Sequence, residues 1–287
     1  MPGEAFIARK VWKQFRATIA LSDVSVAYGK GLNVIMGPNG SGKSTLLRLF
    51  LGLLKPSKGV VESLGLTPWK ATDKLLKNIG ACLEGTSLPW WLSGIDVIRM
   101  FASRRGLEWA RIKEIAEELG VTAYWHRPII GYSMGMRKKL LLLMAFSGVN
   151  EALVLDEPYT LLDSKTIELV DKYIALFSKE VPVLLATHIV TEGVLNADTL
   201  TILTGGHVKA HISKEETGRA VLCKVRDFKE LLNSLTQVAN KVEQLSYRSN
   251  KNRIILSLVD EKFTNKLQGV ETCKNILPGL IEYMEYS

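Results

Sequence analysis

The chain has 287 residues, of which 47% are hydrophobic and 23% are charged, and its formal net charge at pH 7 is +8. This is an ordinary globular composition, which excludes a disordered chain, a collagen and a disulfide-based miniprotein. The positive charge is compatible with nucleotides, anionic lipid headgroups and nucleic acid alike, so it does not choose between them.

Neither a membrane span nor a disulfide framework is expected. The longest apolar run, residues 140–146, is far shorter than the roughly 18 residues that a spanning helix needs. Charged residues interrupt the N-terminal segment, where a secretory signal would be apolar. Cys82, Cys223 and Cys273 lie far apart, with no CxxC pair, so we expect neither a zinc site nor disulfides and favour the cytoplasm.

The first two thirds of the chain alternate between short apolar runs and helix-like stretches. Strands are expected at 32–36, 152–155 and 183–186, and a helix at 43–54. Short apolar runs between helices are typical of a mainly parallel α/β sheet. From 92 to 120 the apolar residues recur at helical spacing only, which predicts a helical insertion on the α/β core.

The pattern restarts after about residue 215. Residues 221–225 and 253–258 are strand candidates and 228–235 is a helix candidate, with further segments at 263–267 and 277–286. We therefore predict a domain over 1–215, with a helical subdomain at approximately 88–148, and a small α+β module over 216–287.

A glycine-rich segment, GPNGSGKST at residues 37–45, matches the pattern G-x-x-x-x-G-K-[ST] between an expected strand and an expected helix. Glycines allow backbone N–H groups to point at phosphate oxygens, and the helix N-terminus adds positive potential. The lysine would reach the β- and γ-phosphates, and the serine hydroxyl would ligate Mg²⁺. A ligand-free glycine turn is the alternative. The expected nucleotide contacts are Gly37, Pro38, Asn39, Gly40, Ser41, Gly42, Lys43, Ser44 and Thr45.

Two acids end the apolar run at 152–155. Asp156 is expected to hold Mg²⁺ together with Ser44, and Glu157 to polarise an attacking water. Without the glycine-rich segment, a solvated strand end would explain the pair equally well.

With these motifs the sequence resembles the ATP-binding cassette (ABC) ATPases over about residues 5–212, and further residues follow in that family's order. Tyr132-Ser-Met-Gly-Met136 resembles the family signature, with methionine where a glycine and the glutamine usually stand. By resemblance, Ser133 and Gly135 face the γ-phosphate of a partner subunit's ATP. Asp163 occupies the position of the aspartate that crosses the dimer interface, and His188 that of the switch histidine.

Two further positions follow from the same resemblance. Glu84 stands where the family usually has the glutamine of its Q-loop, and a carboxylate there can still bind the Mg²⁺ shell. Phe15 occupies the position of the aromatic that stacks on adenine, with Tyr28, in an expected hairpin, as a second candidate. Lys43, Glu157 and His188 are then the expected catalytic residues, and Ser44, Glu84 and Asp156 the metal-binding ones.

The resemblance implies a P-loop NTPase (ABC ATPase) core with a helical subdomain insertion and a small C-terminal α+β module. It implies ATP and Mg²⁺ as cofactors, a second ABC ATPase subunit in a homodimer or heterodimer, and integral membrane permease subunits, with no nucleic acid. The chain would power a permease, as in two-subunit exporters, from the cytoplasmic face of the membrane, and the segment Pro89-Trp-Trp-Leu92 would help to dock it.

Three other functional classes of protein were compared with the sequence. A soluble cassette ATPase acting on ribosomes, DNA or a metal-cluster scaffold is compatible with the basic charge. A non-hydrolysing nucleotide sensor is disfavoured by Lys43, Asp156, Glu157 and His188. A P-loop kinase or GTPase would lack the series at 133–136, 160–163 and 188.

Overall fold

The computed structural model describes residues 3–213, 220–225, 242–248, 253–258 and 270–276. Six strands form the central sheet in the order β5-β6-β7-β3-β8-β9. All neighbours are parallel except β8 and β9, which pair antiparallel. The strands are β3 (Gly31–Met36), β5 (Ile79–Cys82), β6 (Ala152–Asp156), β7 (Pro182–Thr187), β8 (Thr199–Thr204) and β9 (His207–Ser213). The predicted mixed α/β architecture with a mainly parallel sheet is confirmed.

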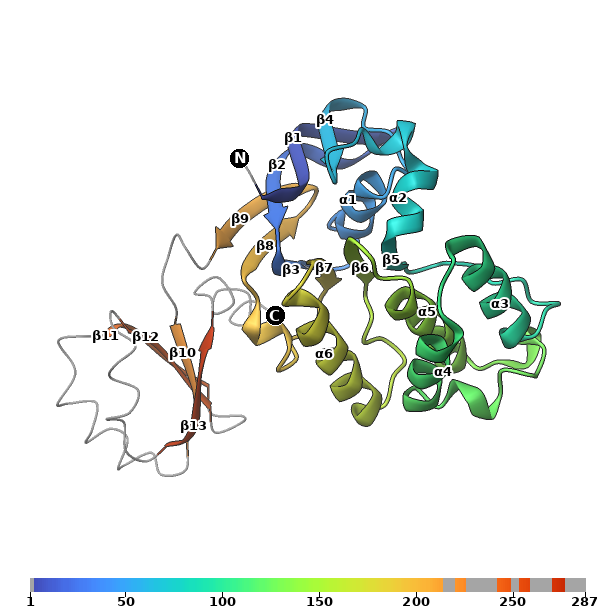
Figure 1. Ribbon diagram of the computed structural model, residues 1–287. Coiled ribbons are helices and arrows are strands. Elements are labelled where there is room, and N and C mark those ends of the chain that lie inside the picture. The colour runs from blue at the N-terminus through green and yellow to red at the C-terminus, as the bar shows by residue number, and fades with distance from the viewer. Residues whose placement is uncertain (1–2, 214–219, 226–241, 249–252, 259–269, 277–287) are drawn as a thin grey trace.

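The central sheet is buried on both faces. Ala152 and Val154 of β6 belong to one hydrophobic core, whereas Leu153 and Leu155 belong to the other, because side chains alternate across a strand. The first core contains residues of α1 (Lys43–Phe50) and α2 (Thr72–Asn78). The second core contains residues of the other four helices of the described part of the chain, which lie on the opposite side of the sheet in Figure 1: α3 (Gly94–Arg105), α4 (Trp109–Glu118), α5 (Met134–Ser147) and α6 (Ser164–Ser178).

A separate antiparallel sheet, in the order β2-β1-β4, covers the first core (Figure 1). Its strands are β1 (Glu4–Phe15), β2 (Thr18–Gly29) and β4 (Lys58–Ser63). Tyr28 of β2 is fully buried, packs edge-to-face on Phe50 and shares a 2.9 Å hydrogen bond with Thr201. It is therefore a core residue and does not offer a surface to adenine.

The three strands predicted in the central sheet are confirmed, but the first helix is shorter than expected. It ends at Phe50, not at residue 54. Gly52 has φ +74°, and a Cβ on it would lie 2.3 Å from the Pro68 carbonyl oxygen. The chain turns there because it packs against a later segment, which helical spacing alone does not reveal. Within residues 3–213, four short 3₁₀ turns lie in the connections: η1 (Pro68–Lys70), η2 (Val121–Ala123), η3 (Ile129–Gly131) and η4 (Val194–Asn196).

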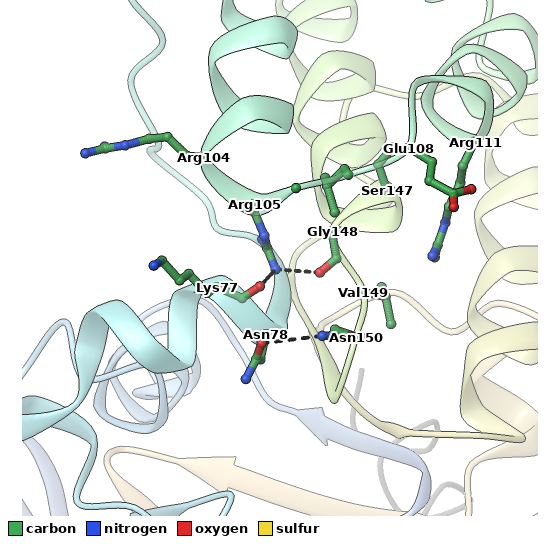
Figure 2. A pocket seen from close by; sticks show the side chains of 12 residues that line it. Lys77, Asn78, Arg104, Arg105, Glu108, Arg111, Ser147, Gly148, Val149 and Asn150 are labelled. Atoms are coloured by element: carbon green, nitrogen blue, oxygen red, sulfur yellow. Dashed lines mark hydrogen bonds between the residues drawn. The ribbon is translucent and has the colours of Figure 1, made fainter.

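Arg105, the last residue of α3, ties the helical insertion to the central sheet. Its guanidinium donates to the Lys77 and Gly148 carbonyls, each at 2.6 Å, and to the Ile79 carbonyl at 3.2 Å. Figure 2 shows the first two bonds at the side of a cavity of about 570 Å³. One side chain therefore joins the end of α3, the end of α5 and the start of β5.

Four strands form a sheet of their own in the order β11-β12-β10-β13, with antiparallel pairing throughout. They are β10 (Ala220–Val225), β11 (Val242–Arg248), β12 (Arg253–Leu258) and β13 (Val270–Ile276). The strands predicted at 221–225 and 253–258 are confirmed, while β11 and β13 were not predicted. The segments at 228–235, 263–267 and 277–286 lie outside the described residues, and the boundary at 215 stays a prediction. Among the described residues, no helix has both the length and the apolar character needed to cross a membrane.

Candidate nucleotide-binding and catalytic site

The glycine-rich segment, which we call the phosphate loop (residues 37–45), joins the end of β3 to α1. A Cβ on Gly37 would lie 2.0 Å from the Leu203 carbonyl oxygen, and one on Gly42, which has φ +107°, would lie 2.6 Å from that of Ala20. Side chains at these two positions have no room, which explains the glycines. Pro38, Asn39 and Gly40 are exposed on the outer edge of the loop.

Lys43 turns back over the phosphate loop. Its ammonium donates to the carbonyls of Gly37 at 2.7 Å and Pro38 at 3.2 Å, and the residue is only 5% exposed. A buried cation held over a loop of backbone N–H groups is an arrangement that suits a bound phosphate.

The strand order brings the predicted acids to the same edge of the sheet. β7 lies between β3 and β6, and parallel strands place their carboxyl ends together. Ser44 of α1 donates a 3.0 Å hydrogen bond to Asp156 Oδ1, and Asp156 Oδ2 is buried with no hydrogen-bond partner. Burial raises the pKa of Asp156, and the bond from Ser44 lowers it in part. A buried carboxylate oxygen without a partner, beside a hydroxyl, fits a hard divalent cation.

Glu157 connects Lys43 to His188. Its Oε1 lies 3.2 Å from the Lys43 ammonium in ion-pair contact without hydrogen-bond geometry, and its Oε2 lies 2.9 Å from His188 Nδ1. Glu157 has φ +47°, a strained conformation for a residue with a side chain. Its side chain is 5% exposed, whereas that of His188 is 39% exposed. We refer to Lys43, Ser44, Asp156, Glu157 and His188 as the strand-end site.

The predicted signature, residues 132–136, and the segment before α6 form a second group of predicted site residues. Ser133 caps α5 by accepting from the Met136 N–H at 3.2 Å, and a Cβ on Gly135 would lie 2.9 Å from the Leu161 carbonyl oxygen. Asp163 caps α6 through two bonds from Thr166, which lower its pKa to about 2, with a smaller contribution from Lys139 at 3.3 Å. Ser133 and Asp163 are exposed, so both can meet another molecule.

Two further predicted residues lie at the margins of the site: Glu84 near Asp156, and Phe15 near the phosphate loop. Glu84 is exposed just after β5, and its charge helps to raise the pKa of the Asp156 carboxyl. Phe15 is 42% exposed at the turn between β1 and β2, with the Lys13 ammonium 4.8 Å from its ring centroid. Its register partner is Thr18, two residues before the Ala20 carbonyl that touches the phosphate loop, so this turn lies beside the loop.

The comparisons with known proteins agree with this geometry. A family model described as ABC transporter matches residues 21–160. Two similar proteins of Bacillus subtilis (strain 168) are uncharacterised ABC transporter ATP-binding proteins. YhcH is 33% identical over 202 residues, or 69% of this chain and 66% of its own length. YdbJ is 31% identical over 208 residues, or 70% of this chain and 68% of its own length. The chain belongs to the ABC transporter ATP-binding protein family.

Another relative of this ABC ATPase is the daunorubicin/doxorubicin resistance ATP-binding protein DrrA of Streptomyces peucetius. It is 31% identical over 215 residues, or 73% of this chain and 65% of its own length. The chain thus spans about two thirds of the length of these relatives.

Solved structures show the same fold at lower identity. An ATP-binding subunit of an ABC transporter superposes with a TM-score of 0.67 at 23% identity, over 74% of this chain and 91% of that one. The dimeric structure of MJ0796, a bacterial ABC transporter cassette, has a TM-score of 0.63 at 22% identity, and the match covers 72% of this chain and 98% of that one.

One residue beside the strand-end site was not identified from the sequence of this ABC ATPase. Lys138 of α5 is 7% exposed, and its ammonium donates to the Asp156 carbonyl at 3.3 Å. Because it lies between Arg137 and Lys139, the sequence alone suggests that it belongs to a solvent-exposed basic segment. The available signal was helical spacing, since Lys138 shares a face with Leu142 and Ala145, both of which are buried.

Proposed function

We propose that this ABC ATPase hydrolyses ATP at the strand-end site and thereby powers a separate membrane permease, in the direction of export. The observation that carries the proposal is the position of Glu157, a buried carboxylate directly after Asp156, in contact with both Lys43 and His188. Phosphoryl transfer needs mainly positioning and charge stabilisation, and these groups supply both.

Each residue has a role that follows from its contacts. Lys43 would exchange the Gly37 and Pro38 carbonyls for phosphate oxygens. Ser44 and Asp156 would hold Mg²⁺, which when bound neutralises phosphate charge, with Glu84 at the edge of that shell. Glu157 would accept the proton of the attacking water. His188, bonded through Nδ1 to Glu157, would keep that side chain oriented and stabilise the transferred phosphoryl group.

We further propose a dimer in which Ser133, Gly135 and Asp163 complete the site of the other subunit. The support is the exposure of Ser133 and Asp163 and the close approach of the half-buried Gly135 to the Leu161 carbonyl, which brings these segments together. Met134 and Leu161 are 66% and 58% exposed beside them, an apolar pair that a partner would cover. MJ0796, which has the same fold, is dimeric.

The proposals of a permease partner and of export rest on separate observations. Trp90 and Trp91 are 58% and 65% exposed, with their rings perpendicular and 5.5 Å apart, which suits a docking surface for another protein. The resistance function in the name of DrrA favours export. The chain would then act at the cytoplasmic face of the membrane, with residues 216–287 as an accessory module.

The variant Glu157→Gln tests the hydrolytic role. It should retain ATP binding and accumulate an ATP-bound dimer, while turnover falls by roughly 10²-fold or more because the general base is lost. Glu168→Gln, an exposed change on α6, is the matched control. ATPase activity equal to that of the wild type in Glu157→Gln would overturn the assignment.

The variant Gly135→Asp, made in the Glu157→Gln background, tests the composite site. A carboxylate there would repel the γ-phosphate of the partner's ATP and prevent ATP-induced dimerisation, measured by light scattering. Gly135→Ala adds the Cβ near the Leu161 carbonyl without the charge and separates steric from electrostatic effects. An unchanged dimer population in Gly135→Asp would remove the signature from the site.

A further inference from the structure

A second set of hydrogen bonds joins the loops that follow β6 and β7, several residues away from the Glu157–His188 contact. Its centre is Asp171 on α6. The Tyr159 hydroxyl donates to Asp171 Oδ1 at 2.6 Å, and the Thr191 hydroxyl donates to the same oxygen at 3.1 Å. The Gly193 N–H donates to Oδ2 at 3.0 Å. One carboxylate therefore holds residues from both loops.

These bonds are of the stronger kind, because a charged acceptor meets neutral donors. Tyr159 is only 2% exposed, and burial, aided by the charge of Asp171, raises its pKa far above the ordinary value, so it stays protonated and donates. The loop that follows β7 has almost no room to shift toward α6. A Cβ on Gly193, whose φ of −63° suits any residue, would lie 2.4 Å from Asp171 Oδ1.

The two ends of this network lie close in sequence to the catalytic pair. Tyr159 is two residues beyond Glu157, and the next residue, Thr160, donates to the Glu157 carbonyl at 2.9 Å. Thr191 is three residues beyond His188, and the intervening Ile189 N–H donates to Thr187 Oγ1 at 3.0 Å. Local hydrogen bonds therefore hold the chain at Glu157 and between the two neighbours of His188, and Asp171 holds both loops again a few residues further on.

We propose that Asp171 is a positioning residue for ATP hydrolysis. It fixes the loop carrying His188 against the segment carrying Glu157, and so maintains the 2.9 Å contact between His188 Nδ1 and Glu157 Oε2. This inference rests on the roles proposed above for Glu157 and His188. A purely structural Asp171 would affect stability but leave the turnover of folded protein unchanged.

The first test compares Asp171→Asn with Glu168→Gln, which removes a negative charge from the exposed face of the same helix. Asp171→Asn should lower kcat about 10-fold or more, because small misplacements of catalytic groups are costly. The dissociation constant for ATP, measured by fluorescent-nucleotide binding, should change by less than about twofold, since the phosphate loop is untouched. Tyr159→Phe keeps the ring, loses one bond and should show a smaller loss in kcat.

The second test uses the close approach of Gly193. Gly193→Ala should lower kcat in the natural sequence, because the added Cβ displaces the carboxylate, but have little further effect in Asp171→Ser, where space is available. All assays are made well below the thermal unfolding midpoint of each variant.

Normal kcat in both Asp171→Asn and Tyr159→Phe, whatever their thermal stability, would overturn the inference, and so would additive effects in the Gly193→Ala cycle. These outcomes leave the proposed function intact, since that function is tested by Glu157→Gln.

Discussion

Two cations, the buried Lys43 and the half-buried Arg105, donate to backbone carbonyls at opposite ends of the central sheet. Lys43 lies at the carboxyl ends of the strands and bonds two carbonyls of the phosphate loop. Arg105 lies at the start of β5 and bonds three carbonyls from three segments. Both regions also contain buried polar atoms without hydrogen-bond partners. The presence of such atoms therefore does not distinguish a functional site from a structural one.

The presence of carboxylate oxygens among those atoms does distinguish the two regions. Beside Lys43 they include Asp156 Oδ2 and Glu157 Oε1, which belong to carboxylates; the Lys43 ammonium already lies 3.2 Å from Glu157 Oε1 in an ion pair, whereas no such contact is seen for Asp156 Oδ2 among the described residues. An ionised oxygen left without a partner is costly to bury unless a cation or proton arrives. Around Arg105 they are the Nε–H of Arg105 itself and the Ser147 hydroxyl, with no acid. The Lys43 region thus requires a ligand to complete it, whereas Arg105 is already held by the fold.

Among the substitutions in these two regions, Lys43→Met should have the largest effect, and that effect should be on ATP hydrolysis. Loss of the phosphate-facing cation should reduce ATP hydrolysis about 10³-fold, or roughly 4 kcal/mol of transition-state stabilisation, and any change in thermal stability should come from the lost ion pair with Glu157. Lys74→Met, at an exposed position of α2, is the control. Steady-state ATPase assays and thermal unfolding measure both effects. A Lys43→Met protein that hydrolyses ATP normally would place the phosphates elsewhere.

Arg105→Met should have the opposite profile. Three carbonyls lose their donor, at about 1 kcal/mol each, so the unfolding midpoint should fall by about 6 to 12 °C. The ATP affinity of the folded protein should change by less than about twofold.

Arg104→Met is the matched control for Arg105→Met, because Arg104 is exposed and Figure 2 shows it directed away from Arg105. Equal stability of the two variants would contradict a structural role for Arg105. A specific loss of ATP affinity in Arg105→Met would mean that the two regions are coupled.

The same contrast explains what could be predicted from the sequence. Gly37, Lys43, Asp156 and His188 each follow an apolar strand at a fixed spacing, so a local pattern marks them. The acceptors of Arg105 are backbone carbonyls, which leave no trace in the residue types around them. Asp171 was missed for a related reason: its partners are hydroxyls and an N–H that only the folded loops bring together.

The sequence also failed to predict the ends of helices and strands that depend on tertiary contacts. The first helix ends early because Gly52 meets the Pro68 carbonyl, a contact across the fold. The strands β11 and β13 lie in segments without clear alternation, and their pairing partners in the sheet define them.

A smaller effect is expected from Gly148→Ala, which tests whether the guanidinium of Arg105 is rigidly held. The added Cβ would lie 2.6 Å from Arg105 Nη1, so relief requires the guanidinium to move and to lose bonds at a cost of about 1 to 2 kcal/mol. In the Arg105→Met background the same substitution should cost less than half as much. Thermal unfolding of the four proteins gives the coupling directly. Equal costs in both backgrounds would mean that Arg105 yields freely.

The smallest effect is expected at Phe15, on the margin of the region that requires a ligand. If its exposed ring stacks on adenine, Phe15→Ala should weaken ATP binding about fivefold, or roughly 1 kcal/mol. Phe15→Tyr keeps the ring and should bind as the wild type does. Leu53→Ala, another exposed apolar position at 45% exposure, controls for general surface changes. Because tripolyphosphate has no base, its competition with fluorescent ATP should give the same inhibition constant in Phe15→Ala and the wild type. An equal loss for tripolyphosphate and ATP would mean that Phe15 supports the phosphate loop and that adenine binds elsewhere.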